Sequence, residues 1–290
     1  MILRQQSSAG HLTYISGRLT EPAPGRFFFN AQTLLGVAGP FSGVVELPSL
    51  GIAYRVEPAA SGQGSELVQR PLRDVVCMDL PRPDKRRVTK TGEVPPLNPA
   101  DFPQDPIPGY QNGVVVLESL HGAKAVIYLD FQGGYTEAWG GIAYQPSNFG
   151  NADIFEIWRR VAEDYIPFNI NVTTDLKAFE GAAQNSRQRV IVTPTDTAQP
   201  GAGGASYTGS FDLTVDTPCW VFETEVPEPK YAAEACAHEA GHGLGLIHNG
   251  QQINGTHVEY FYGQGGTSVT GWAPIMGVAY YDNVTQWCKG

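Results

Sequence analysis

The segment HEAGHGLGLIH, residues 238–248, is the most informative part of the chain. It holds three of the six histidines in 290 residues. His238 and His242 are four residues apart, so in a helix they lie one turn apart on one face and can reach one cation. Gly245 tolerates a positive φ, so it can end the helix and turn the chain until His248 reaches the same cation.

These residue types in this order predict a catalytic zinc site. Three neutral imidazoles, from His238, His242 and His248, leave one position open on a tetrahedral zinc ion, as catalytic sites do. Glu239 follows the first histidine, where its carboxylate can act as the general base toward a water on the metal. The simpler alternative is a helix whose histidines have ordinary surface or core partners. Three histidines, one glutamate and one glycine at the positions of the motif argue against it. A zinc site that has lost catalysis is another alternative, and the presence of Glu239 argues against that one.

The surrounding pattern predicts an α/β (α+β) catalytic domain over residues 113–290. Residues 123–131, AKAVIYLDF, form an apolar run that is typical of a buried strand. Residues 153–165 place apolar side chains on one face of a helix, which a capping box of Asp153 and Glu156 would start. Further strands are expected over residues 169–174, 189–194, 203–211 and 219–222, and a second long helix over 230–246. The expected architecture is a mixed twisted sheet with a zinc-binding active-site helix.

The first part of the chain has a different pattern. Residues 11–57 contain short β-rich runs separated by glycine and proline, which predict a small all-β domain over residues 1–80. Residues 81–112 are rich in proline, carry a basic cluster and lack apolar periodicity, so we expect a linker. The dibasic pair Arg86 and Arg87 in this linker is a candidate site for maturation by proteolysis.

Composition and charge argue against several classes of protein. The net charge is −10, the sum of +3 over residues 1–100 (11 Lys+Arg, 8 Asp+Glu) and −13 over the remainder (8 and 21), so no nucleic-acid partner is expected. No apolar run of about 18 residues is present, so no membrane partner is expected. The start, MILRQQSSAG, lacks the apolar core of a signal peptide. A chain that begins after a removed signal and an intracellular protein both fit this start.

Taken together, these residues resemble the metzincin metalloendopeptidases, whose extended zinc signature is H-E-x-x-H-x-x-G-x-x-H. The resemblance covers residues 120–290, and it is greatest to secreted bacterial reprolysin-like metalloproteases in the segments IWRRVAEDYIPFNINVTTD and APIMGVAYYDNVTQW. It implies a secreted zinc endopeptidase in which Met276 forms a methionine-containing turn below the histidines. Two residues depart from the pattern: Asn249 stands where reprolysins usually have Asp, and Val278 stands where astacins and serralysins have a zinc-binding tyrosine.

The resemblance also implies where a protein or peptide substrate binds. In metzincins an extended peptide pairs with the edge strand that precedes the zinc helix, and main-chain hydrogen bonds hold it there. The matching residues in this chain are Gly204, Ala205, Ser206 and Tyr207. The wall of the specificity pocket is expected within residues 265–278, around Trp272 and Pro274. For each of these residues the alternative is ordinary packing in an edge strand or loop.

The four cysteines permit several arrangements. Two disulfides would have three possible pairings, and a bond between Cys219 and Cys236 would join a strand to the zinc helix. Several metzincin zymogens are kept inactive by a cysteine of the pro-segment whose thiolate binds the zinc. The resemblance thus suggests that residues 1–112 are an inhibitory pro-domain with Cys77 on the metal, with Asp79 as an alternative ligand. The alternatives for Cys77 are a buried small hydrophobe or half of a disulfide.

The competing function is a secreted binding or adhesion module with a vestigial zinc site, in which the β-rich domain recognises the partner. The intact Glu239 favours the enzyme over this module. We expect a monomer with Zn2+ as its cofactor and a protein or peptide as its substrate. Whether Ca2+ also binds, among the many acidic residues, is left open by the sequence.

Overall fold

The computed structural model describes residues 2–6, 13–21, 23, 25–34, 37–47, 50–58, 64–81, 109–253, 255–264, 270–280 and 282–288. The chain divides into two compact units, of which the first comprises Met1–Cys77 and Gly250–Tyr260 and the second comprises Met78–Asn249 and Phe261–Gly290. This division differs from the expected domains in two ways: residues 78–80 belong to the second unit, and residues 250–260 belong to the first. Most of the expected linker, including Arg86 and Arg87, lies outside the described residues.

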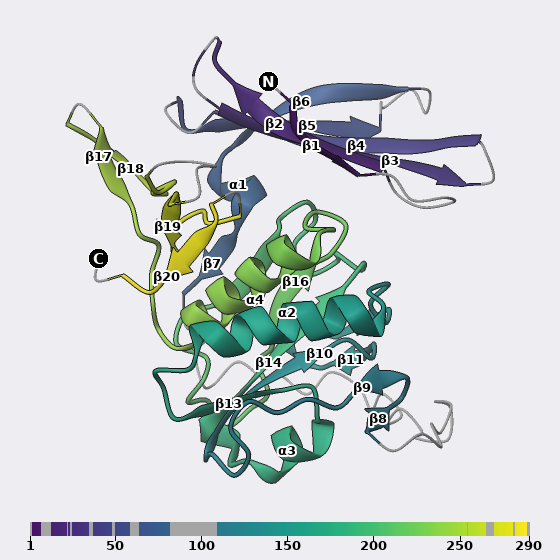
Figure 1. The fold of residues 1–290 in the computed structure, drawn as a ribbon, viewed down its shortest axis with the longest axis vertical. Helices are drawn as coiled ribbons and strands as arrows, with labels where there is room; N and C mark the ends of the chain where they lie inside the picture. The colour runs from purple at the N-terminus through teal and green to yellow at the C-terminus, as the bar shows by residue number, and fades with distance from the viewer. Residues whose placement is uncertain are drawn as a thin grey trace. The chain divides into compact units, whose positions relative to one another are not determined.

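The first unit contains an antiparallel sheet in which each strand pairs with the next one along the chain (Figure 1). Its strands are β1 (Ile2–Gln6), β2 (Thr13–Leu19), β3 (Gly25–Leu34), β4 (Val37–Leu47), β5 (Ile52–Pro58) and β6 (Ser65–Pro71). The short helix α1 (Arg73–Val76) follows β6, and the hairpin of β17 (Gln251–Ile253) and β18 (Thr256–Val258) belongs to the same unit. The β-rich pattern of residues 11–57 thus corresponds to strands.

The second unit contains a mixed sheet with the strand order β13-β10-β14-β16-β15-β7. Its strands are β7 (Met78–Leu80), β10 (Ala125–Asp130), β13 (Ile170–Thr173), β14 (Arg187–Thr193), β15 (Gly204–Tyr207) and β16 (Cys219–Phe222). Neighbouring strands are parallel, except that β15 and β16 are antiparallel. The mixed α/β class is therefore confirmed, whereas β7 was not expected from the sequence.

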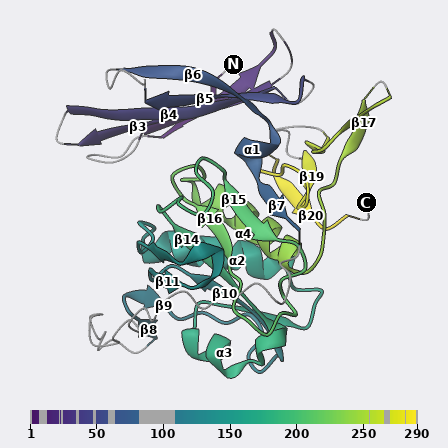
Figure 2. The same ribbon diagram turned by 180° about the vertical axis from the view of Figure 1, so that it is seen from behind.

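Two helices cover one face of this sheet, as the opposite views in Figures 1 and 2 show. They are α2 (Asn151–Asp164) and α4 (Pro229–Gly243), and they pack against each other. The apolar stripe of α2 points inward, as expected, since Ile154, Ile157 and Val161 are buried. The buried face of α2 therefore packs against α4 and the sheet.

The expected capping box of α2 is wrong. The helix begins at Asn151 after Gly150, and no side chain caps it. Glu156 instead binds two arginines of the same helix: its carboxylate accepts hydrogen bonds from Arg159 at 2.8 Å and from Arg160 at 2.7 Å. Ion pairs three and four residues apart satisfy the carboxylate here in place of a backbone N–H.

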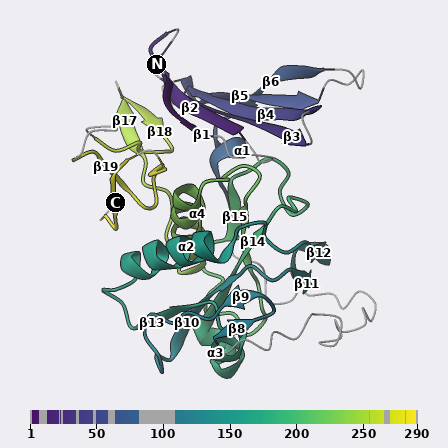
Figure 3. The same cartoon turned by 45° about the vertical axis from the view of Figure 1, so that its right-hand side comes forward.

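The other face of the sheet is covered by different elements (Figure 3). The hairpin of β11 (Gly134–Thr136) and β12 (Ile142–Tyr144) places Ile142 and Tyr144 in one cluster with Trp220. The helix α3 (Leu176–Gly181) packs Phe179 against Tyr128.

The remaining strands form smaller pairs: β8 (Tyr110–Gln111) with β9 (Val114–Val115), and β19 (Trp272–Pro274) with β20 (Val284–Gln286). Within the described ranges, no helix is long and apolar enough to cross a membrane.

The burial of α2 can be tested with two substitutions in that helix. Ile157 is fully buried, whereas Phe155 is 47 % exposed. We expect Ile157→Ala to lower the free energy of unfolding by about 2–5 kcal/mol, because the smaller side chain leaves a cavity. Phe155→Ala should change it by less than about 1 kcal/mol. Urea denaturation followed by circular dichroism measures both values, and equal losses would contradict the buried face described above.

Candidate metal centre

Helix α4 carries most of the polar residues of the site. It starts with Pro229 at its first position, where the fixed φ and the missing N–H of proline are favourable. Every residue from Tyr231 to Gly243 is buried, which is the pattern of a helix enclosed on all sides. His238, Glu239 and His242 are buried with it, and buried polar groups require partners.

The helix ends at Gly243, three residues before the expected end. Gly245 then has a φ of 95°, the conformation expected from its place in the sequence pattern. The N–H of Gly245 donates to the carbonyl oxygen of His242 at 2.8 Å, and the N–H of Leu246 donates to that of Gly241 at 3.0 Å. These bonds close the helix and turn the chain toward the two histidines of α4.

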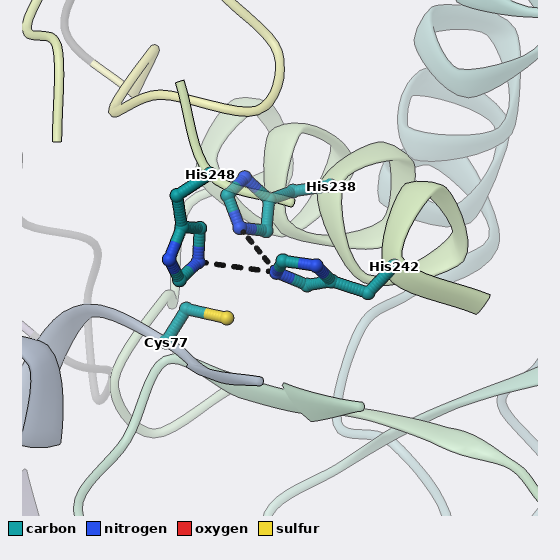
Figure 4. Close-up of side chains that lie close together, drawn as sticks. All are labelled: Cys77, His238, His242 and His248. Carbon is teal, nitrogen blue, oxygen red and sulfur yellow. Dashed lines mark hydrogen bonds between the residues drawn. The ribbon is translucent and has the colours of Figure 1, made fainter. Parts of the chain in front are cut away.

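The three histidines meet at one point (Figure 4). Nε2 of His242 lies 3.1 Å from Nε2 of His238 and 3.1 Å from Nε2 of His248. On the far side of their rings, Nδ1 of His238 lies 2.7 Å from the carbonyl oxygen of Ile275, and Nδ1 of His242 lies 2.9 Å from that of Leu246. A carbonyl oxygen only accepts, so each Nδ1 carries the proton and each of these two Nε2 atoms presents a lone pair.

Two lone pairs that face each other cannot form a hydrogen bond, so this arrangement suits a cation between the rings. Metal-binding histidines commonly donate their second N–H to a backbone carbonyl, as His238 and His242 do here. Burial lowers the pKa of His238 well below its usual value, with His242 and His248 adding to the effect, and burial lowers the pKa of His248 to about 4. Neutral imidazole is the form that binds metals.

Cys77 supplies a fourth donor atom. Its sulfur and one nitrogen from each of the three histidines all lie within 4.8 Å of one another, and this buried group could hold a metal ion (Figure 4). Cys77 is the residue directly before β7, so one peptide bond connects it to a strand of the second unit. In the part of the chain that the structure describes, no other set of three or more histidine, cysteine or acidic side chains converges in this way. The calcium site that the sequence left open has no support there.

Met276 lies against α4, the helix that carries His238 and His242. A methyl group built on Gly241 would lie 2.5 Å from Sδ of Met276, so only glycine leaves room for the sulfur. The backbone of the same turn reaches the site twice: Ile275 accepts the bond from His238, and Met276 accepts one from the N–H of Asn249 at 2.6 Å. The need for glycine at position 241 was missed in the sequence, where it reads as an ordinary helix residue.

Glu239 is a residue of α4, and its side chain lies against β15. Its side chain is fully buried, and a methyl group built on Gly204 would lie 2.7 Å from Cδ of the carboxylate. The first residue of β15 therefore has to be glycine for the carboxylate to occupy this place. The sequence places Gly204 in the substrate strand but does not reveal this contact with Glu239.

The other expected substrate residues of β15 have contacts within the fold. Ala205 is buried in the core on the face of the sheet opposite α4. Ser206 Oγ lies 3.0 Å from Sγ of Cys219, and the ring of Tyr207 lies 4.4 Å from that of Trp139. Their side chains pack inside the protein, so only the main chain of β15 and the half-buried Tyr207 remain candidates for contact with a ligand.

The expectation that β15 is a free edge strand is wrong. β7 pairs with it in parallel, with Met78, Asp79 and Leu80 opposite Ala205, Ser206 and Tyr207. A strand of three residues, distant in sequence and without a clear alternation, gives no signal that predicts this pairing. The side chain of Asp79, the alternative metal ligand, lies outside the described residues.

The expected pocket wall is described in part. Residues 265–269 lie outside the described residues, and Trp272 and Pro274 are in β19. The ring of Trp272 lies 5.9 Å from that of Phe261. Pro274 is buried and precedes Ile275, whose carbonyl holds His238. Pro274 is thus adjacent in sequence to a residue that bonds to a histidine of the candidate metal centre.

The expected disulfide between Cys219 and Cys236 is not formed. None of the four cysteines, all of which lie in the described ranges, is in a disulfide. The thiol of Cys219 donates instead to the carbonyl oxygen of Glu239 at 3.2 Å. Burial raises the pKa of both thiols, so they are protonated in their interior positions.

Comparison with known proteins identifies no relative. No family model, no curated protein and no solved structure matches the chain. The resemblance to metzincins therefore rests on the chain's own motifs, and the metal centre is interpreted from its geometry.

The packing of Gly241 on Met276 can be tested with a double-mutant cycle. Glycine to alanine inside a helix normally stabilises a protein by up to about 1 kcal/mol. Here the new methyl group meets Sδ of Met276, so we expect Gly241→Ala to destabilise the chain by about 1–3 kcal/mol. In a Met276→Ala background the same substitution should be neutral or stabilising. The free energy of unfolding measures all three variants, and an equal effect in both backgrounds would contradict the contact.

Proposed function

We propose that the second unit is a zinc-dependent endopeptidase that hydrolyses peptide bonds, made as a secreted zymogen whose pro-domain is the β-rich first part of the chain. The observation that carries the proposal is the convergence of three imidazole Nε2 atoms on one point, with Glu239 next to the first of them in α4. Three histidine ligands with one further position are characteristic of catalytic zinc sites.

The donor set fits zinc. Imidazole nitrogen and thiolate sulfur are preferred zinc ligands, whereas calcium and magnesium require oxygen ligands. His238, His242 and His248 would hold the ion through Nε2, and Cys77 would take the remaining position in the latent chain. When bound, the metal would lower the pKa of a water to about 7 and polarise the carbonyl of the scissile bond.

Glu239 would act as the general base and then as the general acid. Its carboxylate would take a proton from the attacking water and pass that proton to the nitrogen of the departing amine as the C–N bond breaks. Gly204 allows this carboxylate to lie against β15. The main-chain N–H and C=O groups of β15 would hold an extended substrate near Glu239 once β7 has left.

Two neighbouring contacts would keep the chain inactive. Cys77 lies among the imidazoles, and β7, which starts at the next residue, pairs with β15. Cys77 and β7 are consecutive in sequence. One cut after β7 would therefore separate both of them from the rest of the second unit. Arg86 and Arg87 are the expected site of that cut.

A structural zinc site is the second candidate, because four protein donors are what structural zinc sites have. The chain would then be the binding or adhesion module rather than an enzyme. Glu239 favours the enzyme, since a structural site has no use for a fully buried carboxylate beside its ligands. A Glu239 variant that keeps its metal but loses activity would favour the catalytic site over the structural one.

We expect Glu239→Gln to lower the cleavage of casein by the nicked chain about 10²–10⁴-fold, the usual contribution of a general base. Bound zinc, measured by atomic absorption, should stay at the parent level, because Glu239 is not a ligand. Glu234→Gln is the matched control: Glu234 is another buried glutamate of α4, and burial raises its pKa, so glutamine resembles its protonated form. Equal activity of the two variants, or no cleavage by a nicked parent with zinc bound, would argue for the structural site.

We expect the intact parent to be inactive and Cys77→Ala to cleave casein without nicking, because the fourth donor is gone. Nicking near Arg87 should raise the activity of Cys77→Ala further, since β7 still pairs with β15 in the intact variant. Cys288→Ala, which changes an exposed cysteine, should remain as latent as the parent. An intact Cys77→Ala chain that stays inactive, while the nicked parent is active, would contradict the role of Cys77.

A further inference from the structure

We propose that Tyr260 positions Cys77 for its contact with the metal, an inference that rests on the latency proposed above. Tyr260 is fully buried, and its hydroxyl donates a hydrogen bond of 3.0 Å to the carbonyl oxygen of Cys77. Both residues belong to the first unit, although 183 positions separate them in sequence. Tyr260 acts on the main chain of Cys77 and is a positioning residue rather than a ligand.

The segment 250–260 that ends with Tyr260 is anchored at its base. Asn249 precedes it and Phe261 follows it, and the N–H of Phe261 donates to the carbonyl oxygen of Asn249 at 2.7 Å. The N–H of Asn249 also donates to Met276 at 2.6 Å, and the carbonyl oxygen of Phe261 accepts from Val278 at 3.1 Å. One backbone hydrogen bond therefore closes the base of the segment, and two more join that base to the turn that contains Met276.

Tyr260 is one residue away from this anchored base, so its own backbone is held while its side chain reaches Cys77. The segment begins two residues after His248, the third imidazole of the centre. A tyrosine side chain has only two χ angles, so its hydroxyl loses little freedom when it bonds. The stretch of chain that supplies His248 thus also supplies the group that holds Cys77.

A second restraint acts on the residue that follows Cys77. Met78, the next residue, pairs with Ala205 in the ladder of β7 and β15. The sulfur is two bonds away from Cα, so its reach is set by the position of Cα and by one side-chain torsion. Two restraints on the adjacent main chain therefore keep the sulfur within reach of the ion. Loss of the Tyr260 hydroxyl would remove one of the two restraints.

The test is the rate at which iodoacetamide alkylates Cys77 in the zinc-loaded full chain. Tyr260→Phe removes the hydroxyl and keeps the ring, and we expect Cys77 to react roughly 5-fold faster, the factor that one hydrogen bond corresponds to. Mass spectrometry of peptides identifies the modified residue, because the exposed Cys288 reacts too. Tyr144→Phe is the matched control: it removes another buried tyrosine hydroxyl, which donates to Asp130 at 2.7 Å, and should leave the rate for Cys77 unchanged.

The cobalt-substituted chain separates this inference from the proposed latency. The parent should show thiolate-to-cobalt charge-transfer absorption, and Tyr260→Phe should weaken it. A parent with this absorption and a Tyr260→Phe chain with unchanged absorption and unchanged alkylation would overturn the role of Tyr260 while keeping Cys77 as a ligand. A parent without the absorption would overturn ligation by Cys77 itself.

A milder variant covers the case in which Tyr260→Phe does not fold. The side-chain amide of Gln251 donates to the carbonyl oxygen of Tyr260 at 3.3 Å, so Gln251→Ala loosens Tyr260 without removing its hydroxyl. Alkylation of Cys77 should then increase by a smaller factor in the same direction. A rate equal to that of the parent would count against the proposal.

Discussion

Two hydrogen bonds from imidazole rings to the backbone, His238 to Ile275 and His242 to Leu246, orient two of the three histidines of the candidate metal centre. Each bond fixes the tautomer of its ring and the direction in which the other nitrogen presents its lone pair. Neither acceptor is in α4: Leu246 belongs to the turn after the helix, and Ile275 precedes Met276. The helix end, the turn and the methionine segment must therefore all be in place before the histidines can converge.

Close packing around α4 supports these bonds. Gly204 admits the carboxylate of Glu239, and Gly241 admits the sulfur of Met276. Since protein interiors are densely packed, a side chain at either glycine would displace the group that it meets. Two glycines, one in β15 and one in α4, thus leave the space that the carboxylate and the sulfur occupy.

The sequence predicts the local parts of this structure and misses the parts that depend on distant segments. The spacing of His238, His242 and His248 and the apolar stripe of α2 follow from helix periodicity, and both are found as expected. The pairing of β7 with β15 is a short contact between distant segments, which no local pattern encodes. The disulfide between Cys219 and Cys236 fails because the Cys219 thiol bonds to a backbone carbonyl instead. The capping box of α2 fails because Glu156 binds two arginines.

The first unit is discontinuous, since residues 250–260 complete it. A chain leaves the ribosome from its N-terminus, and domains usually fold as they emerge. Here Tyr260, the partner of the Cys77 carbonyl, is synthesised 183 residues after Cys77 and twelve residues after His248. The nascent chain thus contains all three histidines before residues 250–260 can complete the first unit, so the bond from Tyr260 to Cys77 forms only after most of the chain has been made.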